Sequence, residues 1–195
     1  MEPSLTALLT ELETFGRDND QTVSDRPRRM LNITRDTGEF LAVLVQASHA
    51  RQILEIGTSN GYSTLWLAHA VRAIDGHVTT IECSEYKASL AAGNFKRSGL
   101  TAAITQRIGG AAEILQSEHD ASYDLVFLDS ARSDYPAWWP DIRRVLRPGG
   151  LLVVDNAVSH ADEMAPFIAL VAADEAFSTC TVPVGNGEFL AARHA

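Results

Sequence analysis

Several features that mark other classes of protein are scarce or missing in this sequence. Only two of its 195 residues are cysteine, Cys83 and Cys180, and 16 Lys and Arg face 25 Asp and Glu, which gives a net charge of −9. No basic cluster offsets that charge, so the composition argues against a nucleic-acid surface. No apolar run is long enough to span a bilayer, and the start of the chain lacks the basic residues and apolar core of a signal peptide. Two cysteines without an export signal are therefore expected to be free thiols in a reducing cytoplasm.

The sequence does contain enough apolar material for a full hydrophobic core. Hydrophobic residues make up 46% of the chain and charged residues 21%, which is typical of a globular protein. At this length a single domain over residues 1–195 is expected. We expect residues 1–48 to form a helical segment that covers the functional site, and residues 49–195 to form the core.

Helical and extended patterns alternate along most of the chain. Leucines at helical spacing predict a helix over residues 3–16, polar residues around Pro27 predict a loop over 17–30, and a second helix is predicted over 34–47. The strands are predicted at 52–56, 77–82, 102–107, 123–129 and 150–155. The later helices are predicted at 61–73, 85–98, 110–117, 134–146 and 161–173. This alternation predicts an α/β, Rossmann-like, doubly wound and mostly parallel sheet with helices on both faces.

The last residues have a different pattern. Residues 176–184 and 188–193 flank Gly185-Asn186-Gly187, which is typical of a hairpin turn. The sheet is therefore predicted to end in an antiparallel hairpin.

A glycine turn after the first strand is the strongest indication of a ligand. The apolar run Ile53-Leu54 leads to Glu55, then Gly57 and a short polar loop, and a helical pattern begins near Tyr62. Such a turn allows a ligand to approach the backbone, and the helix start offers free N–H groups. A second acid, Glu82, ends the next strand, where a carboxylate suits hydrogen bonding to ribose hydroxyls. The pattern predicts a nucleoside-containing cofactor.

Two later strands also end in polar residues. Asp129 ends the strand that begins near Asp124, and Asp155-Asn156 ends the apolar run after Gly150. Since ligands bind beyond the carboxyl ends of parallel strands, these three side chains could supply hard oxygen donors to a cation such as Mg²⁺. The alternative is that Asp155 and Asn156 only cap a turn or the following helix.

Two other functions share parts of this pattern. Gly57-Thr58-Ser59-Asn60-Gly61 matches the nucleophile elbow of serine hydrolases, with Asp129, Asp155, His160 and His194 following in the right order. Against it, an elbow normally has several strands before it, and Glu55, Glu82 and Asn156 would be left without a role. A dinucleotide-linked dehydrogenase would need a glycine where Ser59 stands, so a cofactor without phosphates fits better.

Taken together, these motifs give the sequence a clear family resemblance. From about Met30 to its end, the chain resembles the class I S-adenosylmethionine-dependent methyltransferases, and more narrowly the cation-dependent catechol and caffeoyl-CoA O-methyltransferases. The specific parts are residues 55–63, Leu128-Asp129, Asp155-Asn156 and residues 183–187. The resemblance implies transfer of a methyl group to a hydroxyl of a small, catechol-like acceptor. It also implies a homodimer.

The resemblance also implies a role for each matching residue. The cofactor would be held by Met30, Glu55, Gly57, Ser63, Glu82, Cys83, Ala111 and Asp129. Divalent-cation ligands, with Mg²⁺ expected, would be Asp129, Asp155 and Asn156. Tyr135 matches a family aromatic that is expected to pack rather than react.

One catalytic position departs from the family. Where the family often has a lysine that acts as general base, this chain has Arg132, which stays protonated in proteins. Asp129 and Arg132 are the candidate catalytic residues, with Arg132 anchoring an anionic acceptor or steadying a phenolate. Deprotonation would then depend on the metal, a water or His160. The alternatives are a solvated helix-start role for Arg132, a metal-independent methyltransferase, and a non-catalytic cofactor-binding relative.

Overall fold

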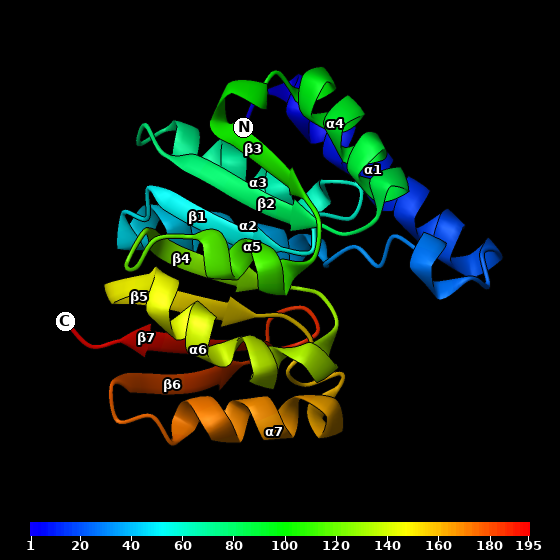
Figure 1. The fold of residues 1–195 in the computed structure, drawn as a ribbon. Helices are drawn as coiled ribbons and strands as arrows, with labels where there is room; N and C mark the ends of the chain where they lie inside the picture. Colours follow the sequence, from blue (N-terminus) through cyan, green and yellow to red (C-terminus); the bar gives the residue numbers. More distant parts are fainter.

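One seven-stranded sheet lies between two layers of helices in the computed structural model, which describes residues 1–195 (Figure 1). The strands are β1 (Gln52–Ile56), β2 (His77–Glu82), β3 (Ile104–Ile108), β4 (Tyr123–Leu128), β5 (Leu146–Val154), β6 (Phe177–Val182) and β7 (Glu188–Arg193). Their order is β3-β2-β1-β4-β5-β7-β6. β1 to β5 are parallel, and β7 is antiparallel to both β5 and β6. The strand order reverses between β1 and β4, which is where ligands bind in open α/β sheets.

The helices divide between the two faces of the sheet. They are α1 (Pro3–Thr22), α2 (Arg35–Ser48), α3 (Tyr62–Arg72), α4 (Glu85–Ser98), α5 (Ala111–Ser117), α6 (Tyr135–Val145) and α7 (Ala161–Ala172). Short 3₁₀ helices lie at Arg26–Arg28, Thr101–Ala103 and Arg132–Asp134. Apolar residues of α1 to α4 pack on one face and those of α5 to α7 on the other, forming two core clusters. α5 and α6 lie in front of the strands in Figure 1, and α2 and α3 behind.

The predicted fold class is confirmed, and two element boundaries are wrong. α1 continues to Thr22 instead of ending at residue 16. Its last turn is polar but contains no helix breaker, and the loop predicted over residues 17–30 is confined to the part after Thr22. Asp20 accepts hydrogen bonds from the N–H groups of Met30 and Leu31, at 2.7 and 2.8 Å, which returns the chain toward the sheet.

The other boundary error is at β5, which begins at Leu146 instead of residue 150. Pro148 and Gly149 suggest a turn, but Leu146 pairs with Tyr123 and a register shift follows before Leu125 pairs with Leu151. The residues between Leu146 and Leu151 therefore form a bulge within the strand and not a separate turn. None of the helices has the length and apolar character that crossing a membrane would need.

Candidate functional site

The turn after β1 brings two strand ends into close contact. Gly57 has a φ of 114°, and a Cβ atom at this position would overlap the carbonyl oxygen of Asp129. Gly61, at the end of the same turn, has a φ of 88° and precedes the first residue of α3. Both glycines are therefore required by the backbone, and α3 begins directly beside the ends of β1 and β4.

Glu55 organises the turn from inside the protein. Its carboxylate is fully buried and accepts hydrogen bonds from the hydroxyls of Ser63 and Thr80, at 2.5 and 2.6 Å, and from the hydroxyl of Thr64. Burial raises the pKa of Glu55 to about 7, against the opposing effect of these hydroxyls. The structure thus brings Glu55 and Ser63 together, with their side chains bonded to each other.

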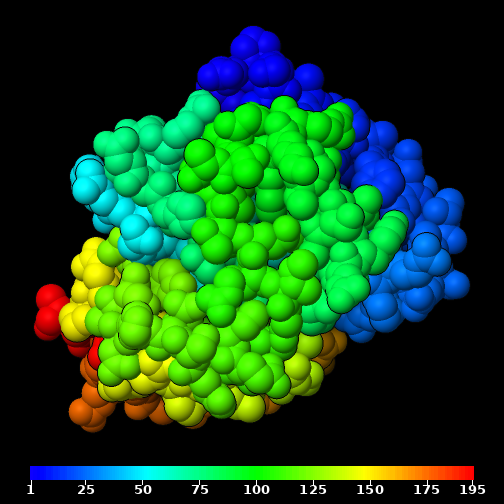
Figure 2. Space-filling model, turned by 45° about the horizontal axis from the view of Figure 1, so that its top comes forward, coloured from blue at the N-terminus to red at the C-terminus, as the bar shows by residue number.

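Glu82 holds the other side of the same turn. One oxygen accepts from the Ser59 N–H at 2.8 Å and the other from the Ser84 N–H at 2.9 Å. The hydroxyl of Ser59 donates to the carbonyl oxygen of Met30 at 2.6 Å, so the segment before α2 lies over the turn. Figure 2 shows the blue N-terminal residues lying against the green surface that includes α4. The predicted neighbours Met30, Glu82 and Cys83 therefore surround the β1 turn.

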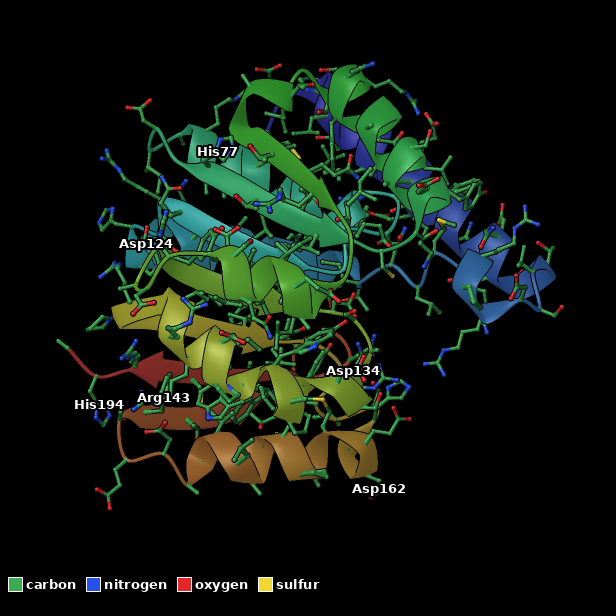
Figure 3. All side chains as sticks on the ribbon, in the orientation of Figure 1. His77, Asp124, Asp134, Arg143, Asp162 and His194 are labelled. Carbon is green, nitrogen blue, oxygen red and sulfur yellow. The ribbon has the colours of Figure 1, made fainter.

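A cavity of about 310 Å³ opens beside Glu82. Its lining comes from the ends of β1 and β2, the residues that follow β3 and β4, and the starts of α5 and α6: Ile56, Gly57, Ile81, Glu82, Cys83, Gly109, Gly110, Ala111, Ala112, Glu113, Ser130, Ala131, Asp134 and Trp138. Four predicted cofactor residues, Gly57, Glu82, Cys83 and Ala111, are among them. Figure 3 places Asp134 at the end of the molecule toward which the parallel strands point. Trp138 is a lining residue that was not among the predicted site residues, and its helical spacing from Tyr135 is the signal that could have found it.

Asp129 and Asp155 lie at the same level on adjacent strands. The last parallel pair of β4 and β5 is Leu128 with Val154, so the next residue of each chain is an aspartate. Asn156 donates from Nδ2 to Asp129 at 3.3 Å and to Asp155 at 3.0 Å. Burial, and for Asp129 also the charge of Asp155, raises the pKa of both carboxyls above the usual range. The three predicted cation ligands are thus brought together.

The donor set at this point fits a hard divalent cation. No three His, Cys, Asp or Glu side chains are placed to hold a metal ion by themselves, and the third member of the predicted ligand set is an amide. The buried carboxyl of Asp155 and the partly buried carboxyl of Asp129 offer oxygen donors of the kind that Mg²⁺ takes, and the oxygen of Asn156 accepts from the Ser159 hydroxyl at 3.3 Å. The amide hydrogens of Asn156 already supply partial positive charge between the two carboxyls.

One acid beside this site was missed in the sequence. Glu188, the first residue of β7, is fully buried, and its Oε1 accepts from the Thr37 hydroxyl at 2.9 Å. Burial, followed by the charge of Asp155, raises the pKa of Glu188 above the usual range. The turn signal at residues 185–187 was visible, but Glu188 meets Asp155 only through the antiparallel register of β5 and β7.

The remaining site candidates lie around the acids. The Arg132 side chain is only 8% exposed and donates from Nε to Glu163 at 2.8 Å. Tyr135 is fully buried, and its hydroxyl oxygen accepts from the Ser130 N–H at 2.6 Å. His160 precedes α7, with its Nδ1 2.9 Å from the Ser159 hydroxyl. Arg132 and His160 both lower the pKa of Asp155, against the larger effect of burial.

The geometry does not assemble a serine hydrolase. The Ser59 hydroxyl donates to the Met30 carbonyl, and neither histidine candidate is bonded to it. His194 lies at the opposite end of the molecule from Asp134, as Figure 3 shows, with its Nε2 3.0 Å from the Ser178 hydroxyl. Ser59 therefore has no base, and it stands instead where a dinucleotide-binding turn needs its middle glycine.

A doubly wound sheet, a nucleoside-sized cavity at its switch point and acids at its strand ends define a class of cofactor-dependent transferases. The family described as O-methyltransferase matches residues 7–194 of the chain. The chain therefore belongs to the class I S-adenosylmethionine-dependent O-methyltransferases, in the group resembling catechol and caffeoyl-CoA O-methyltransferases.

Individual proteins agree with this membership. The chain is 35% identical over 131 residues to the catechol O-methyltransferase of Niastella koreensis. This match covers 66% of this chain and 59% of that protein. It is similar to the solved O-methyltransferase of Bacillus cereus in complex with SAH, with 29% identity, a TM-score of 0.81, and coverage of 96% of this chain and 90% of that chain. It is also similar to TomG of Streptomyces achromogenes in complex with SAM, with 28% identity, a TM-score of 0.80, and coverage of 100% and 91%.

Proposed function

We propose that this O-methyltransferase transfers the methyl group of S-adenosylmethionine to a hydroxyl of a small, catechol-like acceptor with the help of a divalent cation. The observation that supports the proposal is the placement of Asp129, Asp155 and Asn156 at the strand ends next to the cavity. Carboxylate and amide oxygens suit Mg²⁺, which usually takes only one or two carboxylates from the protein.

The nucleoside part of the cofactor would occupy the cavity beside β2. Glu82 would accept hydrogen bonds from the ribose hydroxyls, because the N–H groups of Ser59 and Ser84 hold its carboxylate in place and each oxygen can accept a further bond. Cys83 and Ala111 would lie along the adenine, and Trp138 would cover it, because all three line the cavity. Gly57 would let β1 lie directly against Asp129 beside the methionine part, and Glu55 and Ser63 would act by fixing the turn.

The acceptor would bind next to Asp129 and Arg132. A divalent cation held by the two aspartates and Asn156 would lower the pKa of the acceptor hydroxyl and orient its oxygen. Arg132 would stabilise the negative charge that develops on that oxygen, because its guanidinium is held by Glu163 and stays protonated. Transfer then depends mainly on how well the protein positions the oxygen in line with the methyl group.

The first test is a calorimetric titration with S-adenosylhomocysteine, with and without Mg²⁺ and a simple catechol. We expect micromolar binding of S-adenosylhomocysteine, and catechol binding only when Mg²⁺ is present. Asp155→Asn should remove the Mg²⁺-dependent catechol binding and leave S-adenosylhomocysteine binding intact, whereas Glu82→Ala should weaken S-adenosylhomocysteine at least about tenfold by removing a charged acceptor. Catechol turnover that survives both EDTA and Asp155→Asn would establish the metal-independent alternative.

The oligomeric state stays a prediction. A homodimer is implied by the family resemblance, and light scattering of the purified protein would measure it directly.

A further inference from the structure

A third acid continues the row formed by Asp129 and Asp155. The antiparallel ladder between β5 and β7 pairs Val154 with Phe189, so the next pair outward is Asp155 with Glu188. Directly opposite residues of an antiparallel pair project from the same face with Cβ atoms about 4.5–5.5 Å apart. Asp129, Asp155 and Glu188 therefore lie side by side across three neighbouring strands.

The contacts of Glu188 link the row to a helix. Its Oε1 accepts from the Thr37 hydroxyl in the first turn of α2, at 2.9 Å, and both residues are fully buried. Its Oε2 is buried and has no partner among hydroxyl or N–H groups. The β5–β7 register continues to Asp155 opposite Glu188, so the carboxyl of Asp155 is the neighbour that this free oxygen is placed to meet. A buried polar oxygen without a partner is costly, so its placement beside another carboxyl calls for an explanation.

Two carboxyls can meet in a buried site when one of them keeps a proton and donates it in a hydrogen bond. Glu188 is the member better suited to donate, because Asn156 and Asp129 surround the other side of Asp155. Carboxylates that bind metals are commonly held in this way by a second hydrogen-bonding group behind them.

We propose that Glu188 is a positioning residue of the cation site, which holds Asp155 from behind through a hydrogen bond and ties it through Thr37 to the start of α2. The inference rests on the proposed cation dependence. Glu188 would also link the cation site to the cofactor turn, because the segment before α2 carries the Met30 carbonyl that accepts a hydrogen bond from Ser59.

If Glu188 acts through these two hydrogen bonds, glutamine at the same position should preserve its function. In Glu188→Gln the side-chain NH₂ can donate to Asp155 while the oxygen still accepts from Thr37. Glu188→Leu fills a similar volume and removes both bonds. We expect calorimetric titration with Mn²⁺ alone to show Glu188→Gln within threefold of wild type and Glu188→Leu weakened by about 10- to 100-fold, the usual range for such supporting groups. S-Adenosylhomocysteine affinity should be unchanged in both variants.

The controls separate this role from its alternatives. Thr37→Val removes one hydroxyl and keeps the shape of the side chain, so it should weaken Mn²⁺ binding in the same direction even where Glu188→Leu does not fold. Equal Mn²⁺ affinity in wild type, Glu188→Leu and Thr37→Val would overturn the inference. Equal loss in Glu188→Gln and Glu188→Leu would also overturn it, because the charge and not the hydrogen bond would then matter. A wild-type protein that binds S-adenosylhomocysteine but no Mn²⁺ would overturn the cation site itself, and the role of Glu188 with it.

Discussion

Arg132 combines strong burial with a single hydrogen-bonding partner in the protein. Its Nε donates to Glu163, and the other guanidinium nitrogens make no hydrogen bond within the chain. Among the basic side chains it has the largest effect on Asp129 and Asp155, lowering the pKa of each against burial. A fixed cation beside two acids is suited to stabilising an anionic acceptor oxygen, whereas a general base would need a group that can lose its proton.

Arg132→Met should therefore lower kcat/KM for catechol methylation. A hydrogen bond to a charged group contributes about 1.5–3 kcal/mol, and about 1.4 kcal/mol corresponds to tenfold in rate, so we expect a loss of about 10- to 100-fold. Arg132→Lys keeps the charge and should lose less. Release of S-adenosylhomocysteine measures the rate, and Arg143→Met is the matched control, since Arg143 pairs with Asp174 away from the strand ends. Full activity in Arg132→Met would make Arg132 a helix-start residue only.

How far the sequence identified individual residues depended on how each is positioned. Asp129, Asp155 and Glu82 are the last residues of predicted strands, so the general rule for parallel sheets was enough to bring them to one edge. Glu188 was missed because its neighbour is set by the antiparallel register of a strand pair, which a sequence pattern does not fix in advance. The hydrogen bonds of Glu55 to Ser63 and Thr80 were also out of reach, since they join three different elements.

Of the two glycines in the turn between β1 and α3, Gly57 is the one that lies against the end of β4. Any other residue at position 57 would have to adopt a φ of 114°, which is unfavourable for a residue with a Cβ atom. Its Cβ would also overlap the carbonyl oxygen of Asp129, directly after β4. Backbone cannot move aside as a flexible side chain can. The close approach of β1 and β4 at this point also sets the distance between the cofactor turn and Asp129.

Gly57→Ala should destabilise the protein by about 2–5 kcal/mol, the sum of a strained backbone and an overpacked contact. Denaturant unfolding measures this, and the S-adenosylhomocysteine affinity of the remaining folded protein should fall as well. Gly93→Ala is the matched control, because Gly93 lies on the exposed side of α4 with no atom near its Cβ position. That change should stabilise by about 0.5–1 kcal/mol. A Gly57→Ala protein as stable as wild type would show that the turn relaxes easily.

At the level of elements, the sequence predicted the interiors better than the ends. β1 and β2 match their predicted ranges, as does α4, because each is bounded by polar or glycine residues. α1 and β5 were wrong at one end each. In α1 the polar last turn resembled a loop, and in β5 the pairing of Leu146 with Tyr123 outweighed the local preference of Pro148 and Gly149 for a turn.

Across the whole molecule, buried acids gather at one edge of the sheet. Glu55, Asp129, Asp155 and Glu188 all have a pKa raised mainly by burial, to about 7 in Glu55. An acid whose pKa is higher in the folded than in the unfolded protein binds more protons when folded between those two values. The free energy of unfolding then falls as the pH rises through that interval. For Glu55 the interval runs from 4.5 to about 7, and the loss is on the order of 3 kcal/mol.

Without a divalent cation, the protein should therefore be less stable at pH 8 than at pH 5.5. Mg²⁺ binds the charged acids, so it should raise the melting temperature more at pH 8 than at pH 5.5. Thermal unfolding at both pH values, with MgCl₂ or EDTA, measures the two effects. Asp155→Asn should lose most of the Mg²⁺ effect, while Glu55→Gln should keep it and show a weaker pH dependence. The lowered pKa of His69 acts in the opposite direction, but it is common to all these proteins and cancels in their differences. If wild type and Asp155→Asn respond equally to Mg²⁺ at pH 8, the row of acids is not the site at which the cation stabilises the fold.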